Sequence, residues 1–467
     1  MTQSNPIEQH YRCAEQIAGF QLTGRLKDRK GFFRLGPDVV CYGQTTGDTS
    51  SVVNGDLFDA SKHFEKNGRT IALPFDPAQV LENLRYERYV SSPKSQRWTE
   101  ASPIKWLYYA IRPMLPVAVR KHLQKAYLTQ RGDAFPSWPV DRSVDILLEK
   151  LLALTMQSSQ IDRIPFIWFW PNRYEACAVM THDVETKAGR DFCDELMNIN
   201  DAFGIKASFQ IVPEKRYTVS SAYLENIRKR GFEVNVHGLD HQGNLFESRD
   251  RIRRDAAKIN EYAELFGARG FRSPALYRNA DWFQELNFSY DLTVPNVARL
   301  EAQGGGCCTL LPYFLPGGML ELPLTITEDY TLFHILGEYS TTLWKEQVNA
   351  ILRNHGLIHF LVHPDYIIPD VPRQVYKALL EELCGLRSGR HIWFALPGEI
   401  DHWWRERNQM SLTFDGRDWR VDGPGSDRAT IAYACLNGDG LVYEMAPPSG
   451  VVGRSCNSGV SSSLSLH

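Results

Sequence analysis

Between residues 175 and 395, short apolar runs alternate with longer segments that have one polar face. The short runs predict strands and the longer segments predict helices. The predicted strands are residues 176–180, 207–212, 232–236, 270–272, 290–294, 320–326, 357–362 and 392–395. The predicted helices are residues 190–203, 222–229, 249–266, 342–354 and 373–386. Strands separated by helices favour a parallel sheet, and seven or eight such units predict an α/β fold with a (β/α) barrel.

The pattern changes on both sides of this segment, which divides the chain into four regions. Residues 1–93 mix apolar runs with glycine and aspartate turns, which predicts a small α+β or β-rich domain. Residues 94–165 predict a basic and aromatic helical linker, and residues 166–402 predict the barrel. Residues 403–467 contain strand-like runs and a tail rich in Ser and Gly, so we expect a small β appendage and a flexible end.

Composition and charge exclude several classes of protein. Of the 467 residues, 43% are hydrophobic and 23% are charged, as in an ordinary folded protein. The formal net charge is −3, whereas a nucleic-acid-binding protein is expected to carry a net positive charge. No apolar run reaches the roughly 20 residues of a membrane span. The N-terminus lacks the layout of a secretion signal, and nine scattered cysteines form no disulfide framework, so we expect a cytoplasmic protein.

One basic stretch departs from this balance. Residues 94–132 contain eight Lys or Arg and one acid, Glu100. Within them, residues 104–127 combine basic and aromatic side chains, and such a segment can contact an anionic membrane surface. Pro113 and Pro116 divide it into two short helical pieces, which favours a linker packed on its neighbour. The sequence does not indicate an oligomeric state.

Polar side chains follow four of the predicted strands. The first is followed by residues 181–185 (THDVE), the third by 237–241 (HGLDH), the fourth by 272–274 (RSP) and the seventh by 363–365 (HPD). In (β/α) barrels, functional residues lie at the carboxyl ends of the strands. We therefore expect these residues to meet at one mouth of the barrel.

The spacing of these residues is suited to a metal-dependent hydrolase. Asp183 and Glu185 are two apart and share a face of an extended chain. His237 and His241 are four apart, so a helical turn would bring both imidazoles to one side. Two imidazoles and a carboxylate with one open position describe a catalytic zinc site. A second carboxylate would serve as a base, and a histidine would protonate the leaving group.

The order of the motifs resembles the polysaccharide deacetylases, the fourth family of carbohydrate esterases. The resembling segments are THDVE, HGLDH, FRSPA, ELPLT and FLVHP, over roughly residues 170–400. HGLDH is similar to the metal-binding H-(S/T)-x-x-H motif of that family, FRSP to its R-x-P motif and LVH to its L-x-H motif. The resemblance implies a deformed (β/α) barrel with a divalent metal, most often zinc. It also implies removal of acetyl groups from an N-acetylated sugar in a glycan or glycan precursor, and no nucleic-acid partner.

The resemblance implies a role for each residue at the mouth. His237 and His241 would be metal ligands, and Asp183 would be the general base. Arg272 would hold that carboxylate, while His363 would be the general acid, oriented by Asp291. The metal would bind the oxyanion together with a backbone N–H after Pro274, that of Ala275.

One position departs from the family motif and leaves two assignments open. Val184 occupies the place of the usual metal-binding aspartate. Family members with D-x-E bind the metal through the carboxylate two positions later, which makes Glu185 the third ligand. In the rival assignment, Asp183 binds the metal and Glu185 is the base. Two functional alternatives also remain: hydrolysis of another linear amide or an O-acetyl ester, and an inactive carbohydrate-binding barrel.

Four other features have simpler interpretations. Residues 413–416 (TFDG) imitate the first family motif but lie beyond the barrel, so we interpret them as a turn between short strands. His355 is expected in a turn, and His359 is expected to be a hydrogen-bonded histidine of the core. His182, on the face opposite Asp183, is expected only to pack.

Overall fold

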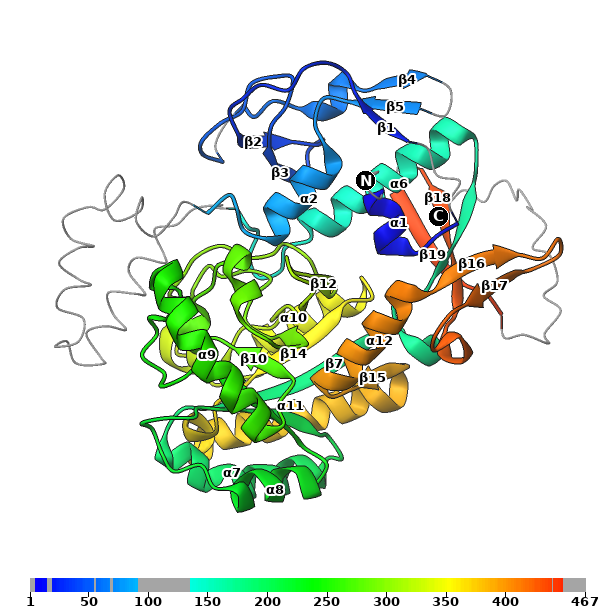
Figure 1. The fold of residues 1–467 in the computed structure, drawn as a ribbon. Helices are drawn as coiled ribbons and strands as arrows, with labels where there is room; N and C mark the ends of the chain where they lie inside the picture. Colours follow the sequence, from blue (N-terminus) through cyan, green and yellow to red (C-terminus); the bar gives the residue numbers. More distant parts are fainter. Residues whose placement is uncertain are drawn as a thin grey trace, which may run out of the picture.

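The centre of the molecule is a nine-stranded, mostly parallel sheet (Figure 1). The computed structural model describes residues 5–14, 19–53, 56–67, 70–90, 135–438 and 440–447. The strands of this sheet are β7 (Ala176–Val184), β8 (Ala207–Ile211), β9 (Glu233–His237), β10 (Gly270–Arg272), β11 (Tyr290–Asp291), β12 (Tyr313–Phe314), β13 (Leu320–Glu321), β14 (Leu357–Leu361) and β15 (Ile392–Phe394). Their order is β12-β13-β11-β10-β9-β8-β7-β14, and β15 also pairs with β7. Each pair is parallel except β12–β13.

An irregular segment after β13 closes this sheet into the predicted deformed barrel. The N–H of Leu324 donates to the carbonyl of Val294 (3.0 Å), and the N–H of Ile326 donates to the carbonyl of His359 on β14 (3.2 Å). The predicted strand at 320–326 is therefore regular only at its first two residues. Pro323 interrupts it, because proline has no N–H to donate to a ladder.

The strand predicted at residues 290–294 is also shorter than expected, because carboxylates bind its backbone. The N–H of Thr293 donates to Oδ2 of Asp291 (3.0 Å). The N–H of Val294 donates to Oε1 of Glu321 (3.0 Å). These donors are satisfied by side chains and take no part in a regular strand ladder.

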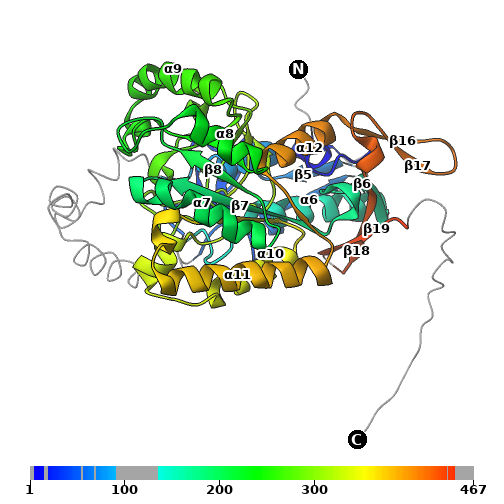
Figure 2. The same cartoon turned by 90° about the horizontal axis from the view of Figure 1, so that it is seen from below.

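Helices cover the outside of the barrel, and their bounds are close to those predicted. They are α7 (Lys187–Ala202), α8 (Ser221–Lys229), α9 (Arg249–Phe266), α10 (Thr342–Leu352), α11 (Asp370–Gly389) and α12 (Pro397–Gln409). Figure 2 shows α9 and α11 on opposite sides of the molecule. Short 3-10 segments include η4 (Leu245–Glu247), η5 (Pro274–Leu276), η6 (Ala280–Glu285) and η8 (Pro364–Ile367), and η7 (Thr331–Leu336) is a π-helix.

The sequence signals at both ends of α9 agree with its observed limits. The hydroxyl of Ser248 accepts a hydrogen bond from the N–H of Arg251 at the first turn, and Gly267 ends the helix with a φ of 57°. Ile252, Ala256 and Ile259 are buried, which is the spacing of one helix face. Local capping and periodicity therefore determine the same limits, residues 249–266.

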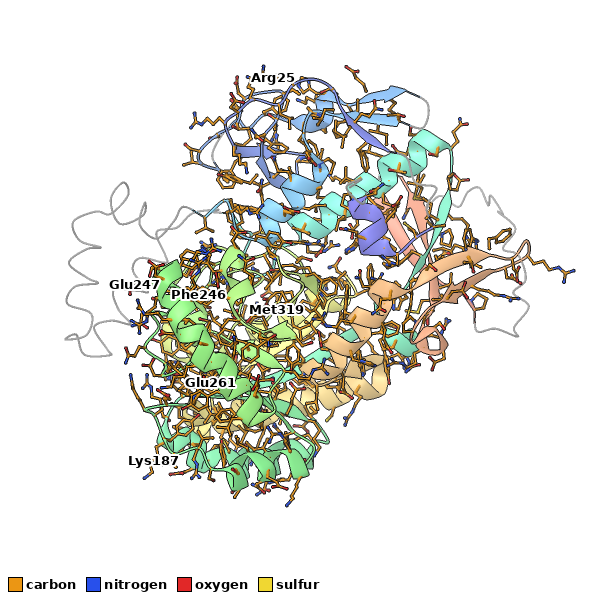
Figure 3. The ribbon with its side chains drawn as sticks, in the orientation of Figure 1. Arg25, Lys187, Phe246, Glu247, Glu261 and Met319 are labelled. Carbon is orange, nitrogen blue, oxygen red and sulfur yellow. The ribbon has the colours of Figure 1, made fainter. Side chains whose placement is uncertain are left out.

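Helices and strands both precede the barrel, and α6 (Ser143–Ser159) among them lies within residues 94–165, the predicted helical linker. These elements are α1 (Pro6–Tyr11), β1 (Phe20–Leu22), β2 (Gly31–Arg34), β3 (Val40–Gly43), η1 (Ala60–His63), β4 (Glu65–Asn67), β5 (Thr70–Leu73), α2 (Pro77–Arg85) and α6. The strands form a β1-β5-β4 sheet and a β2-β3 hairpin. In Figure 3, Arg25 in this region and Lys187 at the start of α7 lie at opposite ends of the molecule.

The β appendage predicted after the barrel includes a strand that precedes the barrel. β6 (Arg163–Ile167) pairs antiparallel with β18 (Ile431–Asn437), which pairs with β19 (Gly440–Met445). β16 (Ser411–Phe414) and β17 (Trp419–Asp422) form a separate hairpin, so residues 413 and 414 end β16 and only 415 and 416 lie in the predicted turn. Two further 3-10 turns are η3 (Pro171–Arg173) and η9 (Ser426–Arg428).

A buried arginine of α12 donates hydrogen bonds to the N-terminal helix and to the end of β6 and the residue after it. Arg407 of α12 is 1% exposed and donates hydrogen bonds to the carbonyls of Ile167 (2.7 Å), Trp168 (3.0 Å) and His10 (3.0 Å). Burial, together with the charge of Arg12, lowers the pKa of Arg407 to about 9. The last barrel helix, the strand β6 and the N-terminal helix thus share one hydrogen-bonding centre.

The basic segment at residues 104–127 lies outside the described residues, so its predicted membrane contact stays a prediction. Among the helices of the described ranges, none is long and apolar enough to cross a membrane.

Candidate metal centre and active site

The carboxyl ends of four barrel strands bring the predicted site residues together. Asp183 lies at the end of β7, and Glu185 follows directly. His237 ends β9, Arg272 ends β10, and His363 lies two residues after β14. Because these strands are parallel within one sheet, their carboxyl ends point to the same mouth.

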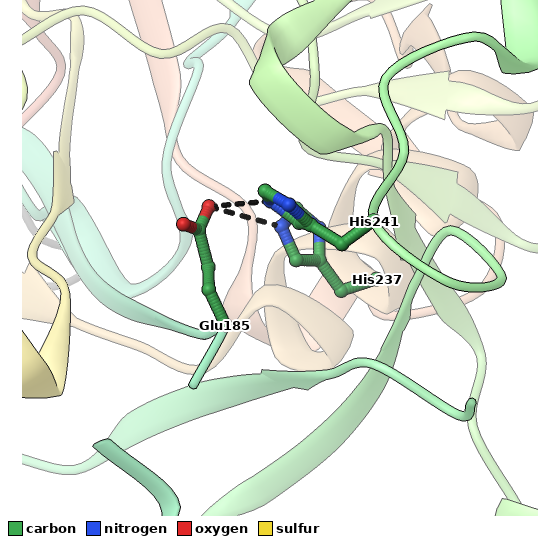
Figure 4. Close-up of side chains that lie close together, drawn as sticks. All are labelled: Glu185, His237 and His241. Atoms are coloured by element: carbon green, nitrogen blue, oxygen red, sulfur yellow. Dashed lines mark hydrogen bonds and ion pairs between the residues drawn. The ribbon is translucent and has the colours of Figure 1, made fainter. Parts of the chain in front are cut away.

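Glu185, His237 and His241 converge at this mouth (Figure 4). Oε1 of Glu185 lies 2.6 Å from Nε2 of His241 and 3.6 Å from Nε2 of His237. The side chain of Glu185 is 17% exposed and points toward the two imidazoles rather than into solvent. One ligand atom from each of the three lies within 4.8 Å of the others.

The hydrogen bonds of His237 leave one of its nitrogens suited to a cation. Its Nδ1 lies 3.1 Å from the carbonyl oxygen of Arg272, which can only accept, so Nδ1 carries the proton. Its Nε2 is buried without a hydrogen-bond partner and lies 3.5 Å from Oδ2 of Asp183 and 3.6 Å from Oε1 of Glu185. A buried nitrogen of this kind is costly unless something binds it. Together with Glu185 and His241, it fits a divalent metal of the zinc type.

The loop from β9 to His241 corrects the predicted helical turn. Gly238 and His241 have φ values of 61° and 57°, in the left-handed region, and no helix spans the two histidines. A Cβ at position 238 would lie 2.5 Å from Cγ of Pro274, so only glycine fits there. The imidazoles thus meet through a tight loop packed against Pro274. Their ring centroids are 5.0 Å apart.

Arg272 holds the carboxylate of Asp183, as the resemblance implied. Nη1 of Arg272 donates to Oδ1 of Asp183 (2.7 Å), and neither side chain is more than 3% exposed. Burial alone would raise the pKa of Asp183, but the charges of Arg272, His237 and His363 outweigh it and lower that pKa. Asp183 is therefore an ionised acceptor, and its Oδ2 lies 3.5 Å from Nε2 of His237.

Two residues that support Arg272 were not assigned to the site from sequence. Its Nη1 also donates to Oγ1 of Thr181 (2.9 Å), and its Nη2 donates to Nε2 of His359 (2.9 Å). Burial, followed by the charge of Arg272, lowers the pKa of His359 to about 3, so the ring is a neutral acceptor. His359 is a hydrogen-bonded core histidine, as predicted, and it also fixes the guanidinium behind Asp183.

The partner of His363 is Asp329, which corrects the role expected of Asp291. Oδ1 of Asp329 lies 2.7 Å from Nδ1 of His363, and its Oδ2 accepts from the N–H of the same residue (2.7 Å). Nε2 of His363 lies 3.4 Å from Oε1 of Glu185. Burial would lower the pKa of His363, but Asp329 and Glu185 outweigh it and raise that pKa well above its ordinary value.

Asp291 contacts a different group. Its Oδ1 accepts from the hydroxyl of Thr293 (2.7 Å), and its carboxyl lies beside that of Glu321. Burial raises the pKa of both carboxyls, and the charge of Asp291 raises that of Glu321 further. Asp291 therefore lies in the wall of the barrel and is not bonded to His363.

Ala275, whose N–H was expected to bind the oxyanion, lies three residues after the end of β10. It is exposed and belongs to η5, with a φ of 53°. Next to it in sequence, Leu276 forms a small buried apolar cluster with Leu324 and Leu361, the last residue of β14.

His182 allows a pH-dependent prediction about stability. It is fully buried, its Nδ1–H donates to the carbonyl of Val362 (2.9 Å), and its Nε2 accepts from Nδ2 of Asn200 (3.0 Å). Burial lowers the pKa of His182 to about 4, whereas the unfolded chain has a value of about 6.5. Between these values the unfolded state binds the proton more tightly, so the free energy of unfolding falls as the pH falls.

We expect the wild type to lose about 2 kcal/mol more unfolding free energy than His182→Gln between pH 7 and pH 5. Urea unfolding of both proteins at the two pH values measures the difference. The same pH dependence in both proteins would show that His182 is not held neutral.

Comparisons with known proteins found solved structures that are similar to about half of this chain. No family model matches the sequence, and no curated protein matches it. A protein of Mycobacterium smegmatis classed among the polysaccharide deacetylases is 19% identical, with a TM-score of 0.43, and the match covers 54% of this chain and 98% of the other. An allantoinase is 13% identical, with a TM-score of 0.39, over 50% and 92%. A family 4 acetyl xylan esterase of Clostridium thermocellum, in complex with a cobalt ion, is 15% identical, with a TM-score of 0.31, over 49% and 91%. The structural neighbours thus include polysaccharide deacetylases, at low identity and over about half of the chain.

Proposed function

We propose that the protein is a metal-dependent hydrolase that removes acetyl groups from an N-acetylated sugar in a glycan or glycan precursor. The observation that carries the proposal is the convergence of Glu185, His237 and His241, with the carboxylate of Asp183 and the imidazole of His363 beside them. This set supplies a cation site, a proton acceptor and a proton donor at one mouth.

Glu185, His237 and His241 would hold the metal, and two imidazoles with one carboxylate favour zinc. When bound, a divalent metal would polarise the acetyl carbonyl and make hydroxide available near neutral pH. Asp183 is held by Arg272 and belongs to one of the two groups that could hold a cation, with Glu185 and His363. Glu185 belongs to both groups, which favours Glu185 over Asp183 as the third ligand.

Asp183 would take the proton from the attacking water, because it is ionised and faces the same space as His237. Arg272 keeps its carboxylate in place. The N–H of Ala275 would donate to the oxygen that becomes negative when the carbonyl is attacked.

His363 would protonate the departing amine of the sugar. Its Nδ1–H donates to Asp329, so the proton on Nε2 faces Glu185 and the mouth. The carboxylate of Asp329 stabilises the cationic ring before the proton is given up. Acetate and the free amine are then the products.

The buried leucine cluster at the mouth suits the methyl group of the acetyl. Leu276 lies next to Ala275, and Leu361 lies two residues before His363. An apolar surface at this point favours a small acyl group over a charged one.

The test measures acetate release by the zinc-loaded protein from a panel of substrates. The panel contains N-acetylhexosamine oligomers, lipid-linked and nucleotide-linked N-acetyl sugars, O-acetylated xylan and linear amides. We expect release from at least one N-acetylated sugar and inhibition by excess chelator. Hydrolysis of only an ester or a non-sugar amide would favour the alternative hydrolase. A protein that never retains zinc and releases no acetate would favour a carbohydrate-binding barrel.

A further inference from the structure

A buried ion pair joins the region before the barrel to the turn at residues 273–278, which follows β10. The guanidinium of Arg278 donates to both carboxylate oxygens of Glu87, which lies two residues after α2. The side chain of Arg278 is 1% exposed and that of Glu87 is 8% exposed. Burial alone would lower the pKa of Arg278, but the charge of Glu87 outweighs it and raises that pKa. The pair has no part in the metal site or in the proposed proton transfers.

Arg278 also holds the backbone of the turn that carries Ala275. Its Nη1 donates to the carbonyl of Leu276 (2.8 Å), so one guanidinium binds both Glu87 and the turn. The side-chain amide of Gln303 accepts from the N–H of Arg278 (3.0 Å) and donates to its carbonyl (3.0 Å). Arg278 is thereby fixed through its backbone as well as through its side chain.

The turn needs such support because its conformation is unfavourable for the residues in it. Ala275 and Leu276 both have a φ of 53°, in the left-handed region that residues other than glycine seldom adopt. The N–H of Leu276 donates to the carbonyl of Ser273 (3.1 Å), which closes the turn locally. A conformation of this kind persists where surrounding contacts hold it, and the hydrogen bond from Arg278 is one of these contacts.

The barrel provides a close-fitting site for the carboxylate of Glu87. The N–H of Gly306 donates to its Oε1 (2.6 Å), and the hydroxyl of Tyr89 donates to the carbonyl of Gly306 (2.6 Å). A Cβ at position 305 would lie 2.5 Å from the same Oε1, and Gly305 has a φ of 121°, so glycine is needed there. Hydrogen bonds to a charged group are stronger than neutral ones, so this carboxylate is a firm anchor for Arg278.

We propose that Glu87 is a positioning residue for the reaction, which acts through Arg278 and holds Ala275, the expected oxyanion donor, in its left-handed conformation. The inference rests on the proposed function and deepens it, because it makes the region before the barrel a part of the catalytic arrangement. An oxyanion donor acts on charge that develops only in the transition state. A displaced turn should therefore lower kcat, with little change in KM or in zinc binding.

The test measures kcat, KM, zinc content and thermal unfolding for two variants of the zinc-loaded full chain, with the best substrate of the panel. Glu87→Gln keeps the size of the side chain but removes its charge and one of its two acceptors. Arg278→Lys keeps the positive charge but loses the planar fork that reaches Glu87 and Leu276 together. We expect each variant to lower kcat by about 10- to 100-fold, as small misplacements of a catalytic group do, with KM and zinc content close to the wild-type values. Arg278→Lys retains balanced charges, so it decides the question if Glu87→Gln does not fold.

Asp145→Asn is the matched control, because it changes another buried carboxylate that joins the region before the barrel to the barrel. Asp145 of α6 accepts from the hydroxyl of Thr309 (2.5 Å) and from the N–H of Leu310 (2.9 Å), and both partners lie outside the turn at 273–278. Its kcat should stay close to that of the wild type, even if its unfolding temperature falls.

Wild-type kcat in the folded variants of Glu87 and Arg278 would overturn the positioning role while the deacetylase proposal stands. An equal fall in kcat in Asp145→Asn would also overturn it, because the effect would then follow from any weakened contact between the two regions. Hydrolysis of only an ester or a non-sugar amide would overturn the proposed function alone, and the positioning role is then decided on that substrate. No hydrolysis of any substrate of the panel would overturn both.

Discussion

Replacing Asp183 with asparagine is expected to lower kcat for acetate release by about 10²- to 10⁴-fold, the usual contribution of a general base. The substitution keeps the size of the side chain and still allows Arg272 to donate to the amide oxygen. It removes the ionised acceptor that lies 3.5 Å from Nε2 of His237. Acetate release under substrate saturation measures the loss.

Zinc content decides between the two assignments of the carboxylates. If Glu185 is the ligand and Asp183 the base, Asp183→Asn retains one zinc per chain and Glu185→Gln binds zinc more weakly. Glu185 is suited to the ligand role because its Oε1 approaches both histidines. The reverse result, zinc lost from Asp183→Asn and kept by Glu185→Gln, would establish the rival assignment.

Asp329→Asn should lower kcat by about 10²- to 10⁴-fold as well, without loss of zinc. Asp329 accepts from both Nδ1 and the backbone N–H of His363, and it is fully buried. A neutral amide cannot stabilise the cationic imidazole as a carboxylate does. The expected result is a defect in kcat with zinc binding of wild-type strength.

Asp291→Asn is the matched control for this variant. Asp291 accepts from Thr293 and lies beside Glu321, so an amide at position 291 can keep the contact with Thr293 and donate to that carboxyl. Its kcat should remain close to that of the wild type. A large loss in Asp291→Asn together with a small loss in Asp329→Asn would contradict the structural assignment of the partner of His363.

Much of the barrel could be predicted from sequence because its signals are local. Apolar runs alternate with capped amphipathic helices, and α9 begins after Ser248 and ends before Gly267, as periodicity and capping both require. The strands at 290–294 and 320–326 were predicted too long. In the first of these strands, carboxylates accept the hydrogen bonds of the backbone N–H groups. In the second, Pro323 has no N–H to donate. The pattern of apolar residues does not predict either effect.

The residues of the site itself were located by one rule, that chemistry follows strand ends. The same rule applied to the strand at 320–326 would have drawn attention to Asp329, three residues beyond it. Asp329 was not predicted, because the family resemblance indicated Asp291 as the partner of His363. The contacts of Arg272 with Thr181 and His359 depend on how β7, β10 and β14 are placed around the barrel. Sequence spacing does not specify such packing.

Metal dependence is tested most directly by a zinc titration of the metal-free protein, with acetate release from an N-acetylglucosamine oligomer as the readout. We expect no release without metal and a linear rise that saturates at one zinc per chain. His237→Ala should show no rise over the same range, because the buried nitrogen that would bind the metal is gone. Full acetate release by the metal-free wild type would contradict the central claim.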